Sequence, residues 1–292
     1  MSAGPRWAVD GRDWSNRAHS RLVDSGRLRW HVQIMGEGPV LLLLHGTGAA
    51  THSWRDLAPL LAEHFTVIAP DLPGHGFTSG RPAGGLAMPA MARAVGELLG
   101  ALDVAPEIIV GHSAGAAIAI RMTIDGLAKP ASIVGLDAAL LPFPGLAAKL
   151  FPALAKALFI NPFAPRIFAQ MARVPGEAGR FLARSTGSTI DAEGVALYER
   201  LLANAGHVGG ALAMMANWDL DALKADLPRL HIPLLLVHGE QDAARPRASA
   251  RDAASLAGHG RLTSLLGLGH LAHEERPEEV ANIIRRFAGE HL

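Results

Sequence analysis

A five-residue segment, Gly-His-Ser-Ala-Gly at 111–115, constrains the fold of this chain more than any other feature. It follows the apolar run 107–110 and leads into the apolar run 116–122, which is the pattern of a buried strand, a tight turn and a helix start. The glycines let the strand and the helix pass close together, while the turn holds the serine in a strained conformation. The serine hydroxyl then stands at a helix N-terminus, where negative charge is stabilised. The segment therefore predicts a nucleophile at Ser113; the alternative is a capping serine in a glycine-rich turn.

Strand-like and helix-like stretches alternate around this segment. Strands are expected at 20–24, 27–35, 40–44, 66–69, 107–110, 131–136, 233–237 and 261–266. Helices are expected at 53–64, 89–102, from 114 onward, 246–256 and 277–289. This alternation predicts an α/β fold with a mostly parallel, doubly wound sheet and helices on both faces.

The alternation stops after the strand at 131–136. From 141 to 217 we expect no strand, only helical stretches interrupted by prolines. We interpret 141–217 as a helical cap inserted into a core domain formed by 1–140 and 218–292. The polar N-terminal residues 1–20 are expected to form an arm that packs loosely on that core.

The composition excludes several classes of function. Lys plus Arg and Asp plus Glu each number 27, so no excess charge indicates nucleic acid as a partner. The chain has no cysteine, which excludes disulfides, thiolate metal sites and cysteine catalysis. The N-terminus lacks the apolar segment of a secretory signal, and no apolar run is long enough to span a bilayer. We therefore expect a cytoplasmic protein.

A serine nucleophile needs a base, and the base needs an acid that orients it. Asp242 follows one predicted strand and His270 follows the last one, so both are expected at the edge of the sheet where Ser113 lies. The order Ser, Asp, His predicts Asp242 as the acid and His270 as the base. Asp137, after the strand at 131–136, is the rival acid, whereas Asp71 lies in a Pro/Gly loop where turn formation is its expected role.

The loop after the strand at 40–44 is expected to complete the site. Its residue Thr47 would donate one backbone amide to an oxyanion, and Ala114 would donate the other. His270 and His273 could share a helical face, but no third ligand follows at useful spacing, so we expect no metal and no cofactor. The substrate-binding residues are predicted to be Gly46, His112, Leu141, Phe143 and Trp218.

These motifs together resemble the α/β-hydrolase superfamily from about residue 20 to the C-terminus. The resemblance is carried by 45–48 (HGTG), 71–76 (DLPGHG), 111–115 (GHSAG), 239–242 (GEQD) and 269–270 (GH). It implies an α/β-hydrolase fold with an inserted cap. Serine at the nucleophile position argues against the dehalogenase and epoxide hydrolase branches, which use aspartate there. Esterase, thioesterase, C–C hydrolase and cofactor-free haloperoxidase-like chemistry stay open.

A closer resemblance covers nearly the whole chain, including the N-terminal arm. The segments that carry it are 11–14 (GRDW), 28–33 (LRWHVQ), 52–57 (HSWRDL), 140–145 (LLPFPG) and 210–218 (GALAMMANW). The chain is similar to the magnesium-chelatase accessory (BchO-type) hydrolases of bacteriochlorophyll biosynthesis. That resemblance implies a photosynthetic bacterium, a tetrapyrrole substrate such as a porphyrin, and contact with magnesium chelatase. The word accessory does not itself specify a reaction.

The predicted cap is apolar and mildly basic. Between Leu141 and Ala216 it holds seven Lys or Arg residues against four Asp or Glu. Such a lid suits a flat apolar ligand with carboxylates, although an ordinary helical cap has the same composition. Lys149 and Lys156 on an apolar helix over 145–160 would suit weak contact with a membrane surface, although Pro152 argues against that helix.

Three hypotheses of function follow from these observations. The first is a serine hydrolase that cleaves an ester, in particular a tetrapyrrole carboxylate ester. The second is a non-catalytic porphyrin-binding accessory of magnesium chelatase. In that case the three triad residues are retained from an ancestral enzyme and have no catalytic role. The third is a generic esterase or haloperoxidase-like enzyme unrelated to pigment.

Overall fold

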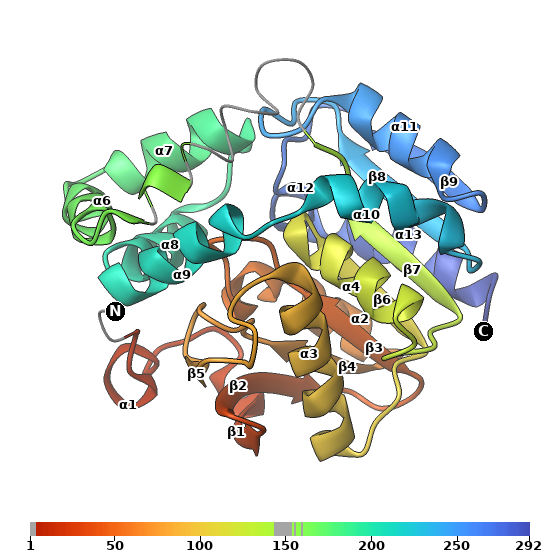
Figure 1. The fold of residues 1–292 in the computed structure, drawn as a ribbon, viewed down its shortest axis with the longest axis horizontal. Helices are drawn as coiled ribbons and strands as arrows, with labels where there is room; N and C mark the ends of the chain where they lie inside the picture. Colours follow the sequence, from red (N-terminus) through yellow and green to blue (C-terminus); the bar gives the residue numbers. More distant parts are fainter. Residues whose placement is uncertain (1–3, 143–153, 155, 159) are drawn as a thin grey trace.

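A nine-stranded sheet crosses the computed structural model, which describes residues 4–142, 154, 156–158 and 160–292 (Figure 1). Its order is β1-β2-β4-β3-β6-β7-β8-β9, with β5 beside β2. The strands from β4 to β9 in this order run parallel, whereas β2 is antiparallel to β1, β4 and β5. Their bounds are β1 Ser20–Ser25, β2 Leu28–Met35, β3 Val40–Leu44, β4 Thr66–Pro70, β5 Ser79–Gly80, β6 Ile108–His112, β7 Ser132–Leu136, β8 Leu234–Gly239 and β9 Gly260–Leu265.

Helices pack on both faces of the sheet (Figure 1). The α-helices of the described residues are α1 Trp7–Asp10, α2 Leu57–Ala62, α3 Met88–Leu102, α4 Ala114–Ile124, α6 Ala164–Ala172, α7 Glu177–Thr186, α8 Ala192–Leu202, α9 Ala205–Ala216, α10 Leu220–Asp226, α11 Arg247–Leu256, α12 Ala272–Glu275 and α13 Pro277–Gly289. Short 3-10 helices are η1 Arg17–His19, η2 Thr51–Trp54 and η3 Leu227–Arg229.

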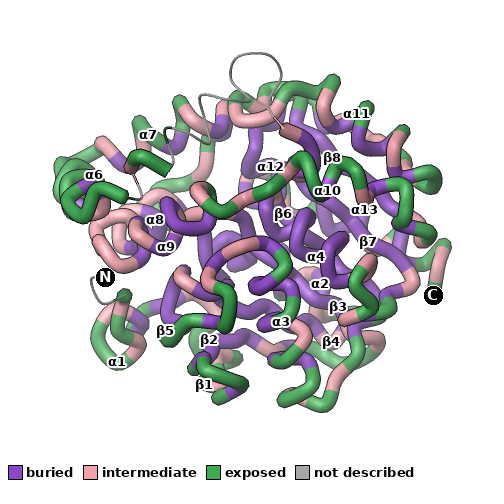
Figure 2. The backbone as a smooth tube through the Cα atoms, in the orientation of Figure 1, coloured by how far each residue is buried: buried purple, intermediate pink, exposed green. Residues whose placement is uncertain are grey.

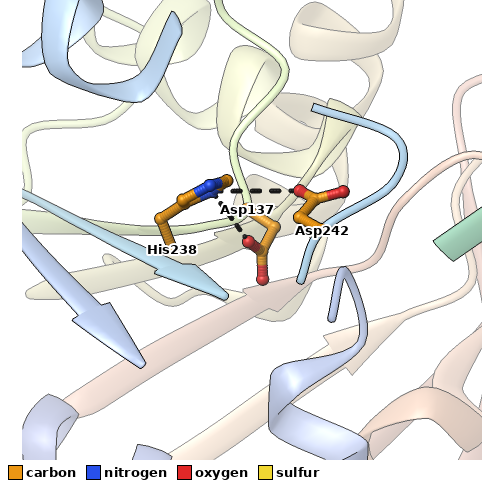
Figure 3. Close-up of side chains that lie close together, drawn as sticks. All are labelled: Asp137, His238 and Asp242. Atoms are coloured by element: carbon orange, nitrogen blue, oxygen red, sulfur yellow. Dashed lines mark ion pairs between the residues drawn. The ribbon is translucent and has the colours of Figure 1, made fainter. Parts of the chain in front are cut away.

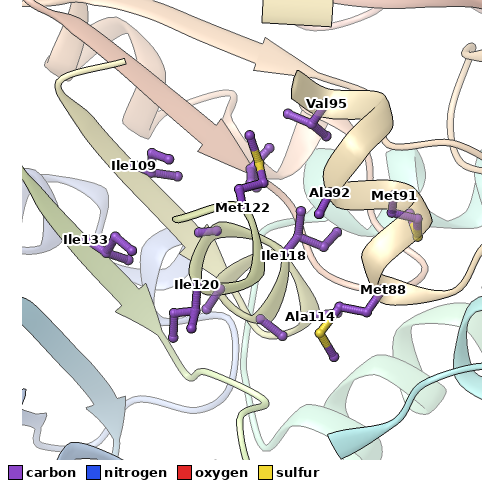
Figure 4. Packing of buried hydrophobic residues seen from close by; sticks show 14 of the residues in the cluster. Met88, Met91, Ala92, Val95, Ile109, Ala114, Ile118, Ile120, Met122 and Ile133 are labelled. Carbon is purple, nitrogen blue, oxygen red and sulfur yellow. The ribbon is translucent and has the colours of Figure 1, made fainter. Parts of the chain in front are cut away.

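The central strands have continuous apolar sequences because their two faces pack in two separate cores. Leu42 and Leu44 of β3 belong to the core under α3 and α4, whereas Leu41 and Leu43 belong to the core under α2 and α13. Figure 4 shows the first core, in which Ile109 of β6 lies near side chains of α3 and α4. The α/β fold with a mostly parallel sheet, predicted from the alternating pattern, is confirmed.

The helix predicted at 53–64 is divided in two, η2 and α2. A continuous helix would need an N–H at position 59 to donate to the Arg55 carbonyl, and Pro59 has none. Asn16 satisfies that carbonyl instead, since its Nδ2 donates to it at 2.9 Å. The side chain of an arm residue thus helps to fix the break.

The N-terminal arm does not pack loosely, and this prediction was wrong. Trp14 is only 2% exposed, and its indole N–H donates to Thr51 Oγ1 at 2.9 Å. Trp7 lies with its ring centre 4.4 Å from that of His31. Two large aromatic side chains bury more apolar area than the polar sequence around them suggests, so they hold the arm on the core.

Helices α6 to α9 lie between β7 and β8 in the chain, and the described part of 141–217 contains no strand. Figure 1 shows them together on one side of the sheet. Helix α9 approaches the loop after β4 so closely that a Cβ on Gly210 would lie 1.8 Å from the Gly74 carbonyl oxygen. The assignment of 141–217 as a cap stays a prediction. Among the described residues, no helix has the length and hydrophobicity that a membrane span requires.

Candidate active site

Ser113 occupies the strained turn between β6 and α4. Its φ of 50° and ψ of −113° are unusual for a residue with a side chain. Its N–H donates to the Leu136 carbonyl at 2.9 Å, and its own carbonyl accepts the N–H of Ala116 at 3.2 Å. These bonds hold the strained serine between the sheet and the first turn of α4.

Both glycines of the segment are required by close backbone contacts. A Cβ on Gly115 would lie 1.9 Å from the Leu44 carbonyl oxygen. A Cβ on Gly111 would lie 2.4 Å from the Ala116 nitrogen. The sequence Gly-x-Ser-x-Gly therefore follows from the tight crossing of α4 over β3 and β6.

We expect Gly115→Ala to lower the free energy of unfolding by about 3 kcal/mol, because the backbone that the methyl group meets cannot move away. Gly100→Ala in α3 is the matched control. A Cβ there meets nothing within 4 Å, so we expect a gain of about 0.5–1 kcal/mol. Denaturant unfolding of both variants checks the pair, and equal effects would contradict the packing argument.

His270 and Asp242 form a hydrogen-bonded pair. The Nδ1 of His270 lies 2.8 Å from Oδ2 of Asp242, whose side chain is fully buried. The other carboxylate oxygen accepts the backbone N–H groups of Ala244 and Arg245 at 2.7 and 2.9 Å. The carboxylate is therefore fixed, and it holds the imidazole with the proton on Nδ1 and with Nε2 free to accept another.

Two further histidines pack beside His270. The Nε2 of His112 bonds to the His270 carbonyl at 2.9 Å, and the rings of His112 and His273 lie 4.6 Å apart. Burial lowers the pKa of His112 well below its usual value and that of His273 to about 3. Both rings are therefore neutral near pH 7, and they support His270 without adding positive charge beside it.

A second acid–histidine pair, formed by Asp137 and His238, lies next to Asp242. Figure 3 shows Asp137, His238 and Asp242 together. The Nδ1 of His238 is 3.2 Å from Oδ1 of Asp137 and 3.9 Å from Oδ2 of Asp242. Burial, opposed in part by the hydrogen bond from His238, raises the pKa of Asp137 to about 6. The rival acid of the sequence thus lies close to Asp242 but bonds to His238.

These three residues also offer ligand atoms within 4.8 Å of one another. Asp137 Oδ1 accepts the Gly239 N–H at 2.8 Å and Asp242 Oδ2 bonds to His270, whereas Asp137 Oδ2 is buried without a hydrogen-bond partner. His238 was missed in the sequence, although it directly precedes the motif that contains Asp242.

The predicted oxyanion loop lies against the serine. A Cβ on Gly46 would lie 2.7 Å from His112 Nδ1 and 3.1 Å from the Ser113 Cβ, so a larger residue there would displace the buried histidine. His45 holds the loop, because its Nδ1 bonds to the Gly46 carbonyl at 2.8 Å and its Nε2 accepts the Leu72 N–H at 2.8 Å. Next along the loop, the Thr47 hydroxyl contacts the sulfur of Met214 in α9 at 3.4 Å.

The other predicted residues lie in different settings. Ala114 opens α4 and is 4% exposed, and His112 is 3% exposed. Leu141 is buried, and Trp218 is half-buried and packs on the same core. Phe143 lies outside the described residues.

The sequence profile described as "Alpha/beta hydrolase family" matches residues 41–283, which include Ser113, Asp242 and His270. The chain belongs to the alpha/beta hydrolase family. The family and the fold predicted from the sequence are thereby confirmed, and family membership supports hydrolytic chemistry in general.

Two relatives and one solved structure show which proteins this chain is similar to. It is 37% identical over 274 residues to the Magnesium-chelatase 30 kDa subunit of Rhodobacter capsulatus, which covers 93% of this chain and 95% of that protein. It is 28% identical to a pimeloyl-[acyl-carrier protein] methyl ester esterase of Xanthomonas oryzae pv. oryzae, over 88% of this chain and 98% of that one. A thermophilic esterase from Thermogutta terrifontis superimposes with a TM-score of 0.75 at 20% identity, over 94% and 99% of the two chains.

Arg55 joins the core of this hydrolase to helix α8. Its guanidinium donates to Glu274 Oε2 at 3.0 Å and to Asp191 Oδ1 at 2.9 Å. The Tyr198 hydroxyl donates to the other Glu274 oxygen at 2.7 Å. Burial raises the pKa of Glu274 to about 8. Because Glu274 follows His270 by four residues, this network also fixes the segment that carries the histidine.

As the pH rises from 4.5 to about 8, we expect the titration of Glu274 to lower the free energy of unfolding of this hydrolase. In that window the folded protein keeps the Glu274 proton, whereas the unfolded chain releases it near the ordinary value of 4.5. Glu274→Gln removes the titration, so its unfolding free energy should depend less on pH. Denaturant unfolding at several pH values measures the slope, with the exposed Glu278→Gln as control. A slope equal to that of the wild type would contradict the assignment.

Proposed function

We propose that this protein is a serine hydrolase in which Ser113 attacks an ester, His270 moves the proton and Asp242 orients His270. The observation that carries the proposal is the Asp242–His270 pair at the ends of β8 and β9, beside a strained serine at the end of β6. Adjacent parallel strands end at the same edge of the sheet, where active sites of such folds lie.

In the proposed reaction, Ser113 Oγ forms a bond to the ester carbonyl carbon while its proton passes to His270 Nε2. Asp242 stabilises the imidazolium that forms. The backbone amides of Thr47 and Ala114 would donate to the oxyanion, the second with help from the N-terminus of α4. The alcohol then leaves with the proton from His270. Water next attacks the acyl group on Ser113 while its proton passes to His270, and the acid is released as His270 returns a proton to Ser113 Oγ.

The proposed substrate is a tetrapyrrole carboxylate ester. The relative named as a magnesium-chelatase subunit supports a role beside that enzyme, and the relative named as a methyl ester esterase supports ester cleavage. A porphyrin with propionate groups would suit the apolar, mildly basic predicted cap. Contact with magnesium chelatase belongs to the same proposal.

The second candidate is a non-catalytic accessory that binds a porphyrin and presents it to the chelatase. The name of the Rhodobacter relative favours it, because that name describes a subunit and no reaction. This candidate predicts that substitutions of Ser113 leave the biological role intact. A generic esterase or haloperoxidase-like enzyme is the third candidate, and it predicts normal pigment without the protein.

Complementation separates these candidates. In a strain that lacks the protein and has lost pigment, we expect the wild type to restore pigment and Ser113→Ala to fail. Restoration by Ser113→Ala, together with tight porphyrin binding by the purified variant, would establish the accessory role instead. A strain whose pigment never changes would contradict both.

A further inference from the structure

Helix α6 carries an apolar stripe on its outer side. Ile167 and Met171 lie one turn apart and are each 55% exposed, and Phe163 and Val174 extend the stripe beyond the two ends of the helix at 62% and 50% exposed. The spacing of four residues places Phe163, Ile167 and Met171 on one helical face, and Val174 follows in the turn after the helix. The buried side of α6 consists of small residues: Ala164, Ala169 and Ala172. The amphipathic helix thus presents its larger apolar side chains to solvent.

Exposed apolar side chains are concentrated on this part of the molecule. Of the 13 large hydrophobic side chains that are exposed among the described residues, eight lie between 154 and 181. We define the α6–α7 patch as six of them: Phe163, Ile167, Phe168, Met171, Val174 and Phe181. Figure 2 shows the exposed turns of α6 and α7 at the outer edge of the protein. Single exposed apolar residues are ordinary, whereas a concentration of them is typical of an interaction surface.

The charges among these residues are almost all positive. Between 154 and 184 the described residues include five cations, Lys156, Arg166, Arg173, Arg180 and Arg184, in a chain without net charge. The one acid there, Glu177, forms an ion pair with Arg180. Long cationic side chains beside apolar ones can reach anionic headgroups while the apolar side chains enter the acyl boundary. Positive charges beside apolar side chains complement an anionic lipid surface. A protein partner would instead need acidic and amide side chains placed opposite these cations, so we favour the lipid surface.

We propose that the α6–α7 patch docks this protein on an anionic lipid surface. The helix over 145–160 that was predicted to contact a membrane, with Lys149, lies largely outside the described residues. The present proposal therefore rests on α6 and α7. It is independent of the proposed hydrolase reaction.

The patch is connected to the candidate active site through the end of α7. The Thr186 carbonyl accepts the N–H of His270 at 2.8 Å and that of Ala243 at 3.2 Å. The Ser188 hydroxyl accepts the N–H of Leu271 at 2.8 Å. The helix that would contact lipid therefore ends on the two loops that carry Asp242 and His270. Docking at α6 and α7 would bring a lipid-dissolved ligand to this edge of the sheet.

Vesicle sedimentation of the 292-residue protein tests the proposal. We expect wild type to pellet with vesicles of phosphatidylglycerol and phosphatidylcholine, to pellet much less with phosphatidylcholine alone, and to be released by salt. The triple variant Ile167→Gln, Met171→Gln, Phe181→Gln should bind anionic vesicles at least about tenfold more weakly. The control variant Leu22→Gln, Leu266→Gln changes exposed apolar residues elsewhere and should bind as wild type.

A second variant pair tests the charges. Arg166→Gln with Arg184→Gln should weaken binding to anionic vesicles, whereas Arg21→Gln with Arg27→Gln, exposed on a different part of the chain, should not. Failure of wild type to bind anionic vesicles, or equal binding by the patch variants and their controls, overturns the proposal.

Other occupants of the patch give different results. A dimer in solution that the triple apolar variant dissociates would show that a second copy covers the patch, and it would overturn lipid docking. Ser113→Ala should bind vesicles as wild type does, so failure of the hydrolase proposal leaves this measurement unaffected. Circular dichroism and unchanged thermal unfolding of each variant confirm that loss of binding is not loss of fold.

Discussion

Replacing Ser113 by alanine is expected to reduce ester turnover by at least about 10³-fold, which corresponds to about 4 kcal/mol of transition-state stabilisation. The substitution removes the attacking oxygen and leaves the Asp242–His270 pair in place. It also replaces a residue at φ 50° with one that adopts that conformation no more easily, so the backbone strain is retained and stability should stay close to that of the wild type. Turnover of an activated ester such as p-nitrophenyl acetate, and labelling by a fluorophosphonate, measure the effect.

The chain offers a matched control in a second Ser–His–Asp array. Ser20 Oγ lies 3.0 Å from His31 Nε2, and His31 Nδ1 lies 2.8 Å from Asp71 Oδ2. Ser20 has an ordinary extended backbone, with φ −80° and ψ 138°, and it begins a strand instead of preceding a helix. If the strained turn and the helix N-terminus make the nucleophile, Ser20→Ala keeps full activity and labelling. Equal loss in the two variants, or labelling that persists in Ser113→Ala, would contradict the role of Ser113.

The sequence predicted those features that depend on short segments. The turn at Ser113 follows from adjacent residues, and Asp242 and His270 each follow an apolar run that forms a strand. Their pairing could be expected because parallel strands end at one edge of the sheet. Their roles in a reaction stay proposals.

Features that depend on contacts between distant segments were not predicted. Asp137 and His238 meet because the register of β7 and β8 pairs Leu136 with Val237, which makes the next two residues neighbours. No local pattern specifies that register.

The network around Glu274 shows the same limit over a longer distance. Arg55 and Glu274 are 219 positions apart in the chain, and each looks like an ordinary surface charge in the sequence. The packing of α12 against η2 buries both side chains, and burial then raises the pKa of the carboxyl.

Helix α6 illustrates why composition could not show whether the apolar residues of the predicted cap face the protein interior or the solvent. Periodicity gives the face on which Phe163, Ile167 and Met171 lie, but not the direction of that face. Alanines pack inward, so the larger side chains point outward. The larger apolar side chains of α6 therefore form part of an outer surface.

Replacing Asp242 by asparagine is expected to reduce ester turnover by about 10³–10⁴-fold, while Asp137→Asn should cost less than about tenfold. Asp242 Oδ2 accepts the Nδ1–H of His270 at 2.8 Å, whereas the nearest histidine partner of Asp137 is His238. An asparagine at 242 can present its NH₂ group to the ring, which favours the tautomer that leaves no free acceptor for the serine proton. Steady-state turnover of the two variants on one ester measures the difference.

The pair of variants also decides between the two acids, because both changes keep the size of the side chain. Asparagine tolerates the positive φ of 44° found at Asp137, so the effect of Asp137→Asn reports the lost charge. A large loss in Asp137→Asn with near-normal turnover in Asp242→Asn would assign the orienting role to Asp137. Comparable large losses in both would mean that Asp137, His238 and Asp242 act as one coupled unit. The 3.9 Å between His238 and Asp242, against the 2.8 Å between His270 and Asp242, favours the expected result, in which only Asp242 is essential.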